Sequence, residues 1–74
     1  MQENTITKSR QKQKHMNILL QGYYFTVIFD GDLDKFIAKH SKEFDSAQYL
    51  VFKDILGHLH HIQKIAILDY EIYD

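Results

Sequence analysis

The absence of cysteine is the feature that most constrains this chain, because no disulfide can help to stabilise its 74 residues. At this length, folding buries roughly 60% of the surface of the unfolded chain, so the hydrophobic gain barely exceeds the cost in conformational entropy. The chain can therefore build one small apolar core and no second domain. A segment that orders without burying apolar surface lowers the stability, and association with a partner raises it.

The first 16 residues differ in charge from the rest of the chain. They carry four basic side chains against one acidic residue, Glu3, for a local charge of +3, whereas residues 17–74 sum to −4. The overall charge of −1 is therefore a cancellation. This asymmetry predicts a flexible basic N-terminal arm over residues 1–16 and a single compact α+β domain over residues 17–74.

The segment 17–29 (NILLQGYYFTVIF) is dense in β-branched and aromatic residues, which predicts a strand. Both of its faces are apolar, as in a strand that is covered on both sides. Gly22 interrupts the run. It is either a bulge in one long strand, which we favour, or the tip of a hairpin.

A helical pattern follows the turn signal Asp30-Gly31. Asp32 is a suitable N-cap, and its carboxylate can accept hydrogen bonds from the first turn. The side chains expected to face the core recur at helical spacing; they are Leu33, Phe36, Ile37, His40 and Phe44.

A second helix is predicted from about Ala47 to His61. Its apolar stripe is broad, and it consists of Leu50, Val51, Ile55, Leu59 and Ile62 with Tyr49, Phe52 and Leu56 beside them. A stripe of this width must contact two surfaces, such as a sheet and a partner. Gly57 lies inside this helix, where it costs about 1 kcal/mol relative to alanine.

The last segment, 64–74 (KIAILDYEIYD), alternates between apolar and polar positions, which predicts a strand with one acidic face. A helix with Ile62, Ile65, Leu68 and Ile72 on one face is the alternative. The predicted fold class is thus α+β: a small single domain with the order strand–helix–helix–strand, the first strand divided if Gly22 forms a hairpin, and both helices packed on one face of a small sheet. Because two strands form a marginal sheet, an edge can also pair with another chain.

The histidine run GHLHHIQK is the only pattern that points toward a metal. On a helix, His58 and His61 share a face, and Asp54 lies one turn before His58, so these three are the metal-ligand candidates. They match no known metal motif, and histidines are favourable at the C-terminus of a helix. We therefore predict no bound metal and no cofactor.

The basic residues of the arm alternate with polar ones, which suits contacts with phosphate groups; they are Lys8, Arg10, Lys12 and Lys14. Without aromatic residues in the arm, any binding to nucleic acid is expected to be independent of sequence. The chain has no glycine-rich phosphate loop or nucleophile motif, and the acidic DGDLD lacks the later ligands of a calcium loop. We predict that the protein is not an enzyme.

The leading hypothesis is a small non-enzymatic protein-binding module, a regulator, adaptor or inhibitor that occupies the surface of a partner protein. The partner is another protein or a second copy of this chain, and binding of nucleic acid by the arm is the alternative. Nine isoleucines, eight lysines and one arginine indicate an AT-rich genome, as in phage and mobile elements. No apolar span suits a membrane, so the expected location is the cytoplasm. The predicted contact residues are Tyr49, Phe52, Leu56, Asp69, Glu71 and Tyr73.

Overall fold

A computed structural model describes residues 13–74, and the first three basic residues of the predicted arm lie outside this range. The described part contains six strands, one α-helix and one short 3-10 helix. In chain order they are β1 (Lys14–Leu20), β2 (Tyr23–Phe29), α2 (Leu33–His40), β3 (Ser41–Phe44), β4 (Ala47–Lys53), β5 (Leu59–Gln63), η1 (Lys64–Ala66) and β6 (Asp69–Tyr73).

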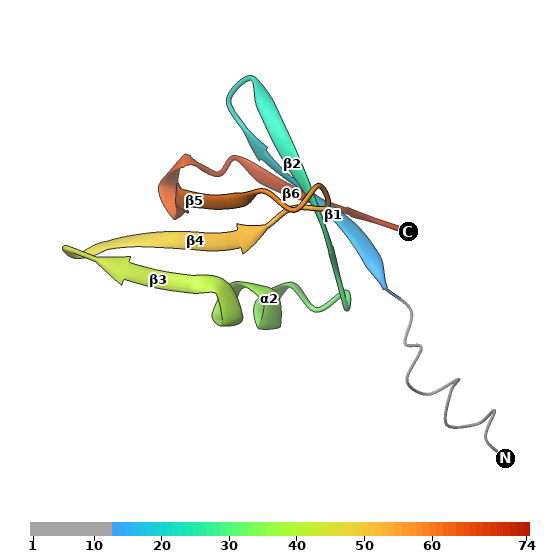
Figure 1. The fold of residues 1–74 in the computed structure, drawn as a ribbon, viewed down its shortest axis with the longest axis horizontal. Helices are drawn as coiled ribbons and strands as arrows, with labels where there is room; N and C mark the ends of the chain where they lie inside the picture. The colour runs from blue at the N-terminus through green and yellow to red at the C-terminus, as the bar shows by residue number, and fades with distance from the viewer. Residues whose placement is uncertain (1–12) are drawn as a thin grey trace, which may run out of the picture.

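The strands form two three-stranded antiparallel sheets, with the orders β2-β1-β6 and β3-β4-β5 (Figure 1). In the figure, β2 runs steeply across the direction of β4 and β5. The chain also links the sheets through the backbone, since the amide of Ile55, after β4, donates to the carbonyl of Thr26 in β2 at 2.8 Å. The protein is therefore a small, mostly β domain in which the two sheets face each other.

The predicted order strand–helix–helix–strand is wrong, because the segment predicted as the second helix forms β4 and β5. β4 is the central strand of its sheet and is apolar on both faces: Leu50 and Phe52 are buried, and Tyr49 and Val51 on the other face are half-buried. Four consecutive apolar residues followed by an apolar turn imitate a broad helical stripe. Gly57, with φ of +87°, belongs to the turn that separates the two strands.

The first predicted strand is a hairpin, so our preference for a bulge at Gly22 is also wrong. Leu20 pairs with Tyr23, and a two-residue loop joins β1 to β2. Gly22 occupies the second loop position with φ of +86°, a conformation that glycine adopts at little cost. The hairpin places β1 in the middle of its sheet, where it pairs with β2 on one side and β6 on the other.

The first predicted helix is present as α2. The Asp32 carboxylate accepts a hydrogen bond from the amide of Lys35 at 3.1 Å, as expected of an N-cap, and Phe36 is buried. The helix ends at His40, because Ser41 is already extended, so Phe44 lies in β3 and is exposed. Among the described residues, no helix is long and apolar enough to cross a membrane.

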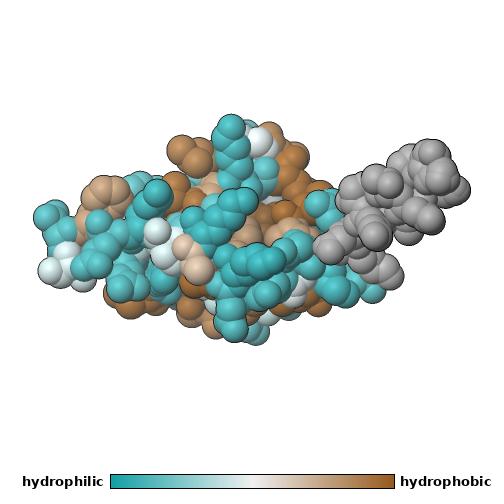
Figure 2. All heavy atoms as spheres, turned by 90° about the horizontal axis from the view of Figure 1, so that it is seen from below, coloured by the Kyte–Doolittle hydropathy of each residue, from teal (hydrophilic) through white to brown (hydrophobic). Residues whose placement is uncertain are grey.

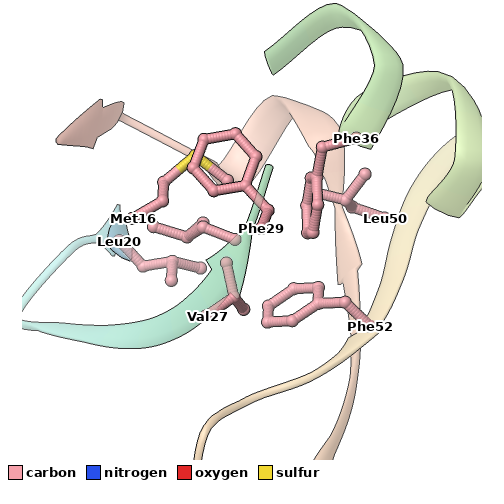
Figure 3. Close-up of a cluster of buried hydrophobic side chains, with 8 residues drawn as sticks. Met16, Leu20, Val27, Phe29, Phe36, Leu50 and Phe52 are labelled. Atoms are coloured by element: carbon pink, nitrogen blue, oxygen red, sulfur yellow. The ribbon is translucent and has the colours of Figure 1, made fainter. Parts of the chain in front are cut away.

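The core lies where the β1–β2 hairpin meets β4 and α2 (Figure 3). Its buried members are all apolar; they are Met16, Ile18, Leu20, Val27, Phe29, Phe36, Leu50 and Phe52. The ring of Phe36 packs against those of Phe29 and Phe52, with centroids 5.7 and 6.3 Å apart. Met16, placed at the end of the predicted arm, is fully buried in β1, so the folded part begins before residue 17.

Shortening Leu50 tests this arrangement, because the side chain is fully buried between the sheets. We expect Leu50→Ala to lower the free energy of unfolding by about 2–5 kcal/mol, as measured by urea denaturation. Leu59→Ala is the matched control, since Leu59 lies on β5 with 67% of its surface exposed. A helical segment would bury both leucines, so equal losses from the two variants would contradict the sheet.

The β3–β4 turn offers a second test of the fold. Asp45 and Ser46 form its two-residue loop with φ of 50° and 69°, which makes it a type I′ turn without glycine. Ser46→Gly relieves the steric cost at that position and is expected to raise the free energy of unfolding by about 0.5–1 kcal/mol. Gln48→Gly, within β4, is expected to lower it instead, and stabilisation by both variants would argue against this register.

Candidate functional site

Three of the predicted contact residues, Asp69, Glu71 and Tyr73, lie together on the face of the β2-β1-β6 sheet that points away from the core. They alternate along β6, and pairing with β1 aligns them with the side chains of β1 and β2 on the same face. We call this surface the outer face of the first sheet. Its nine residues are Tyr24, Thr26 and Ile28 on β2, His15, Asn17 and Leu19 on β1, and Asp69, Glu71 and Tyr73 on β6.

Asn17 is the polar centre of this face. Its side-chain oxygen accepts hydrogen bonds from the Thr26 hydroxyl at 2.7 Å and the Tyr73 hydroxyl at 3.3 Å. Its amide nitrogen donates to the Glu71 carboxylate at 3.4 Å. One side chain thus joins all three strands and fixes the positions of the polar groups on this face.

Aromatic and aliphatic side chains surround the polar centre. Tyr73 stacks on the ring of His15 with centroids 5.3 Å apart, and Tyr24 and Ile28 are exposed on β2. The Nδ1 atom of His15 is enclosed and has no hydrogen-bond partner among residues 13–74. The apolar residues on this face add nothing to the core, which lies on the other side of the sheet, so they are available for contacts with another molecule.

The edge of this sheet is acidic. Asp69 and Glu71 are exposed on β6, and Asp74 follows the strand directly. Its carboxylate forms an ion pair with Nζ of Lys14 at 2.6 Å, and this pair joins the two ends of the described part of the chain. Carboxylates along an edge strand disfavour pairing with a similar strand and attract a basic surface.

The other three predicted contact residues lie elsewhere. Phe52 is only 2% exposed and belongs to the core, so it cannot contact a partner. Tyr49 lies on the outward face of the other sheet, where its ring meets those of Phe44 and His61 at 5.8 and 4.7 Å. Leu56 is exposed in the β4–β5 turn. The six residues therefore do not form one surface, because Tyr49, Phe52 and Leu56 lie on a strand and a turn and not on one face of a helix.

The metal candidates do not converge as they would on a helix. His61 points to the outward face of its sheet, whereas the Asp54 carboxylate accepts a hydrogen bond from Nε2 of His60 at 2.7 Å. Nδ1 of His58 lies 3.9 Å from the same carboxylate. Within the described part of the chain, no group of three potential ligands could hold a metal ion.

Asp54 has a structural role that the sequence analysis missed. Its carboxylate is 6% exposed and also accepts hydrogen bonds from the amides of Leu56 and His58, at 2.9 and 3.0 Å. The hydrogen bond from His60 and then these backbone bonds lower the pKa of Asp54 to about 2. His60 packs in turn on Phe25, with ring centroids 3.6 Å apart. An Asp at the start of a turn and Gly57 near its end were the available signals.

The residues proposed for nucleic-acid binding are described only in part. Lys8, Arg10 and Lys12 lie outside the described residues, so the structure says nothing of them. Lys14 lies in β1, where its Nζ pairs with Asp74 and its aliphatic stem passes 3.4 Å from the position that a Cβ on Gly31 would take. The charge of Lys14 is therefore already engaged by a carboxylate of the same chain.

Comparison of the chain with known protein families, curated proteins and solved structures finds no match. The proposed function therefore depends on the surfaces of this structure alone.

The low pKa of Asp54 predicts a pH dependence of stability. Because the folded state favours the charged carboxylate, its contribution is complete above about pH 4 and is lost as the pH falls toward 2. In thermal melts between pH 5 and pH 2, we expect the stability difference between the parent and Asp54→Asn to shrink over this interval. His58→Ala, which leaves the hydrogen bond from His60 in place, should retain the parent's profile. A constant difference between the parent and Asp54→Asn would contradict the role of Asp54.

Proposed function

We propose that this protein is a small non-enzymatic protein-binding module, and that its partner contacts the outer face of the first sheet. The observation that carries the proposal is the combination of exposed aromatic residues with a fixed polar centre on one face. Tyr24 and Tyr73 supply large apolar surfaces with few rotatable bonds, and hydroxyl groups that can form hydrogen bonds. Buried tyrosines contribute strongly to the affinity of many protein interfaces.

The polar network on Asn17 supports the same proposal. Side chains that are already hydrogen-bonded to one another lose less conformational entropy on binding than free ones. Thr26, Asn17 and Tyr73 are held in this way across three strands. A partner can therefore dock on a surface whose polar groups need little rearrangement.

The charges on β6 indicate the kind of partner. Asp69 and Glu71 are exposed on the edge strand, and the only basic residue on the outer face is His15, which lies under Tyr73. Opposite charges increase the rate of encounter and restrict the orientation of docking. We therefore propose a partner protein with a basic surface, which this module regulates or inhibits by covering it.

A photo-cross-linking experiment in the source cells tests this proposal. The photoreactive residue p-benzoylphenylalanine replaces Tyr24 on the outer face of the first sheet or, as the matched control, Phe44 on the outward face of the other sheet. Both side chains are aromatic and similarly exposed, at 60% and 51%. We expect position 24 to capture one defined protein, identified by mass spectrometry, and position 44 not to capture it.

The charge of β6 is tested in the same cells. Glu71→Lys, combined with the photoreactive residue at position 24, is expected to reduce capture at least about fivefold, since one lost charge contact at an interface is worth roughly 1 kcal/mol. A cross-linked product of twice the chain's mass would identify a second copy as the partner. Equal capture from both positions, or capture that Glu71→Lys leaves unchanged, would contradict the proposed face.

A further inference from the structure

A pocket of about 390 Å³ lies beside α2. Figure 2, which views the domain from below, shows hydrophobic surface between hydrophilic side chains. The last residues of β2, the residues of α2 and Lys53 at the end of β4 line the pocket. Pockets that bind small molecules usually have volumes of roughly 300–1,000 Å³. Of the nine residues on the outer face of the first sheet, only Ile28 also lines this pocket.

The rim of this pocket is positively charged. Lys35, Lys39 and Lys53 line it, so three of the five lysines in the acidic part of the chain meet at one place. Two elements far apart in the sequence bring them together, since Lys35 and Lys39 lie one turn apart on α2 and Lys53 on β4. This concentration of positive charge runs against the net charge of −4 of residues 17–74.

The acidic groups nearby neutralise only part of that charge. Asp30 is the one carboxylate in the lining, and it pairs with Lys35 at 3.3 Å. Neither Lys39 nor Lys53 forms an ion pair with a carboxylate of residues 13–74. Two ammonium groups at the rim thus remain available for an anion that comes from outside.

The floor of the pocket is apolar, and Val27, Phe29 and Phe36 form it. The ring of His40 lies over Phe36, with centroids 4.3 Å apart, and its Nδ1 donates to the carbonyl of Phe36 at 3.0 Å. This bond keeps the imidazole at the edge of the floor. The lining thus combines ammonium groups with apolar side chains, and one molecule that carries an anionic group and an apolar body would match both.

We infer that this pocket binds a small organic anion, in which a phosphate or carboxylate group contacts Lys39 and Lys53 and an apolar body packs on the floor. The site is separate from the outer face of the first sheet, because its lysines lie on α2 and β4 and only Ile28 is shared. The two proposals can therefore fail independently.

Titration of the full chain, followed by the amide signals in ¹H–¹⁵N NMR spectra, tests this inference. The probes are phenyl phosphate and benzoate, with inorganic phosphate and benzyl alcohol as controls that carry only the charge or only the apolar body. We expect saturable shifts at residues 27–30, 35–40 and 53 with phenyl phosphate or benzoate, and the tighter of the two identifies the anionic group. Both controls should bind at least about fivefold more weakly, since each lacks one set of contacts.

Lysine variants locate the contact. Lys39→Gln and Lys53→Gln are each expected to weaken binding of the tighter probe about fivefold or more. Lys42→Gln on β3 and Lys64→Gln in η1 remove the same charge elsewhere and should leave binding unchanged. Shifts that do not saturate, shifts outside the pocket, or equal losses from all four variants would overturn the inference.

Discussion

The packing of the β1–β2 hairpin against β4 is the contact on which the rest of the structure depends. Within residues 13–74, most of the apolar residues that cover the inner face of each sheet come from the other sheet, and no disulfide can replace that contact in a chain without cysteine. Ile18 and Met16 from one sheet and Leu50 from the other are fully buried at this junction. α2 adds Phe36 to this core from the side (Figure 3). The buried ring holds the helix against the sheets, and the pocket with Lys35, Lys39 and Lys53 lies beside that helix.

Because the two inner faces are used for folding, function is left to the outer faces and to the pocket beside α2. The outer face of the first sheet combines exposed tyrosines with polar groups held by Asn17, whereas the pocket combines lysines with an apolar floor. The two surfaces have opposite charge, and this separation is hidden in a net charge of −1. The proposed protein partner and the proposed small organic anion would therefore contact different parts of one domain.

The parts of the fold that were predicted correctly depend on neighbours in sequence. The α2 helix has its N-cap at Asp32 and its apolar side chains one turn apart, and the alternation along β6 places Asp69, Glu71 and Tyr73 on one face. The segment from about Ala47 to His61 was predicted as a helix because β4, which is apolar on both faces, and the turn after it repeat apolar residues at intervals that also suit a helix. Of the predicted contact residues, the three on β6 lie together on one face, whereas Phe52 is buried in the core.

The sequence alone determined the local features: the α2 helix, the extended segments at each end, the turn at Gly22 as one of two options, and the acidic strand. The tertiary structure decided which residues share a surface. Asn17 forms hydrogen bonds with Thr26, Glu71 and Tyr73 only because β1 pairs with two strands from different parts of the chain. Lys39 and Lys53 line the same pocket only because α2 packs beside β4. A strand obtains its hydrogen bonds from its neighbours, whereas a helix obtains them within itself, so a strand's surroundings cannot be derived from its own residues.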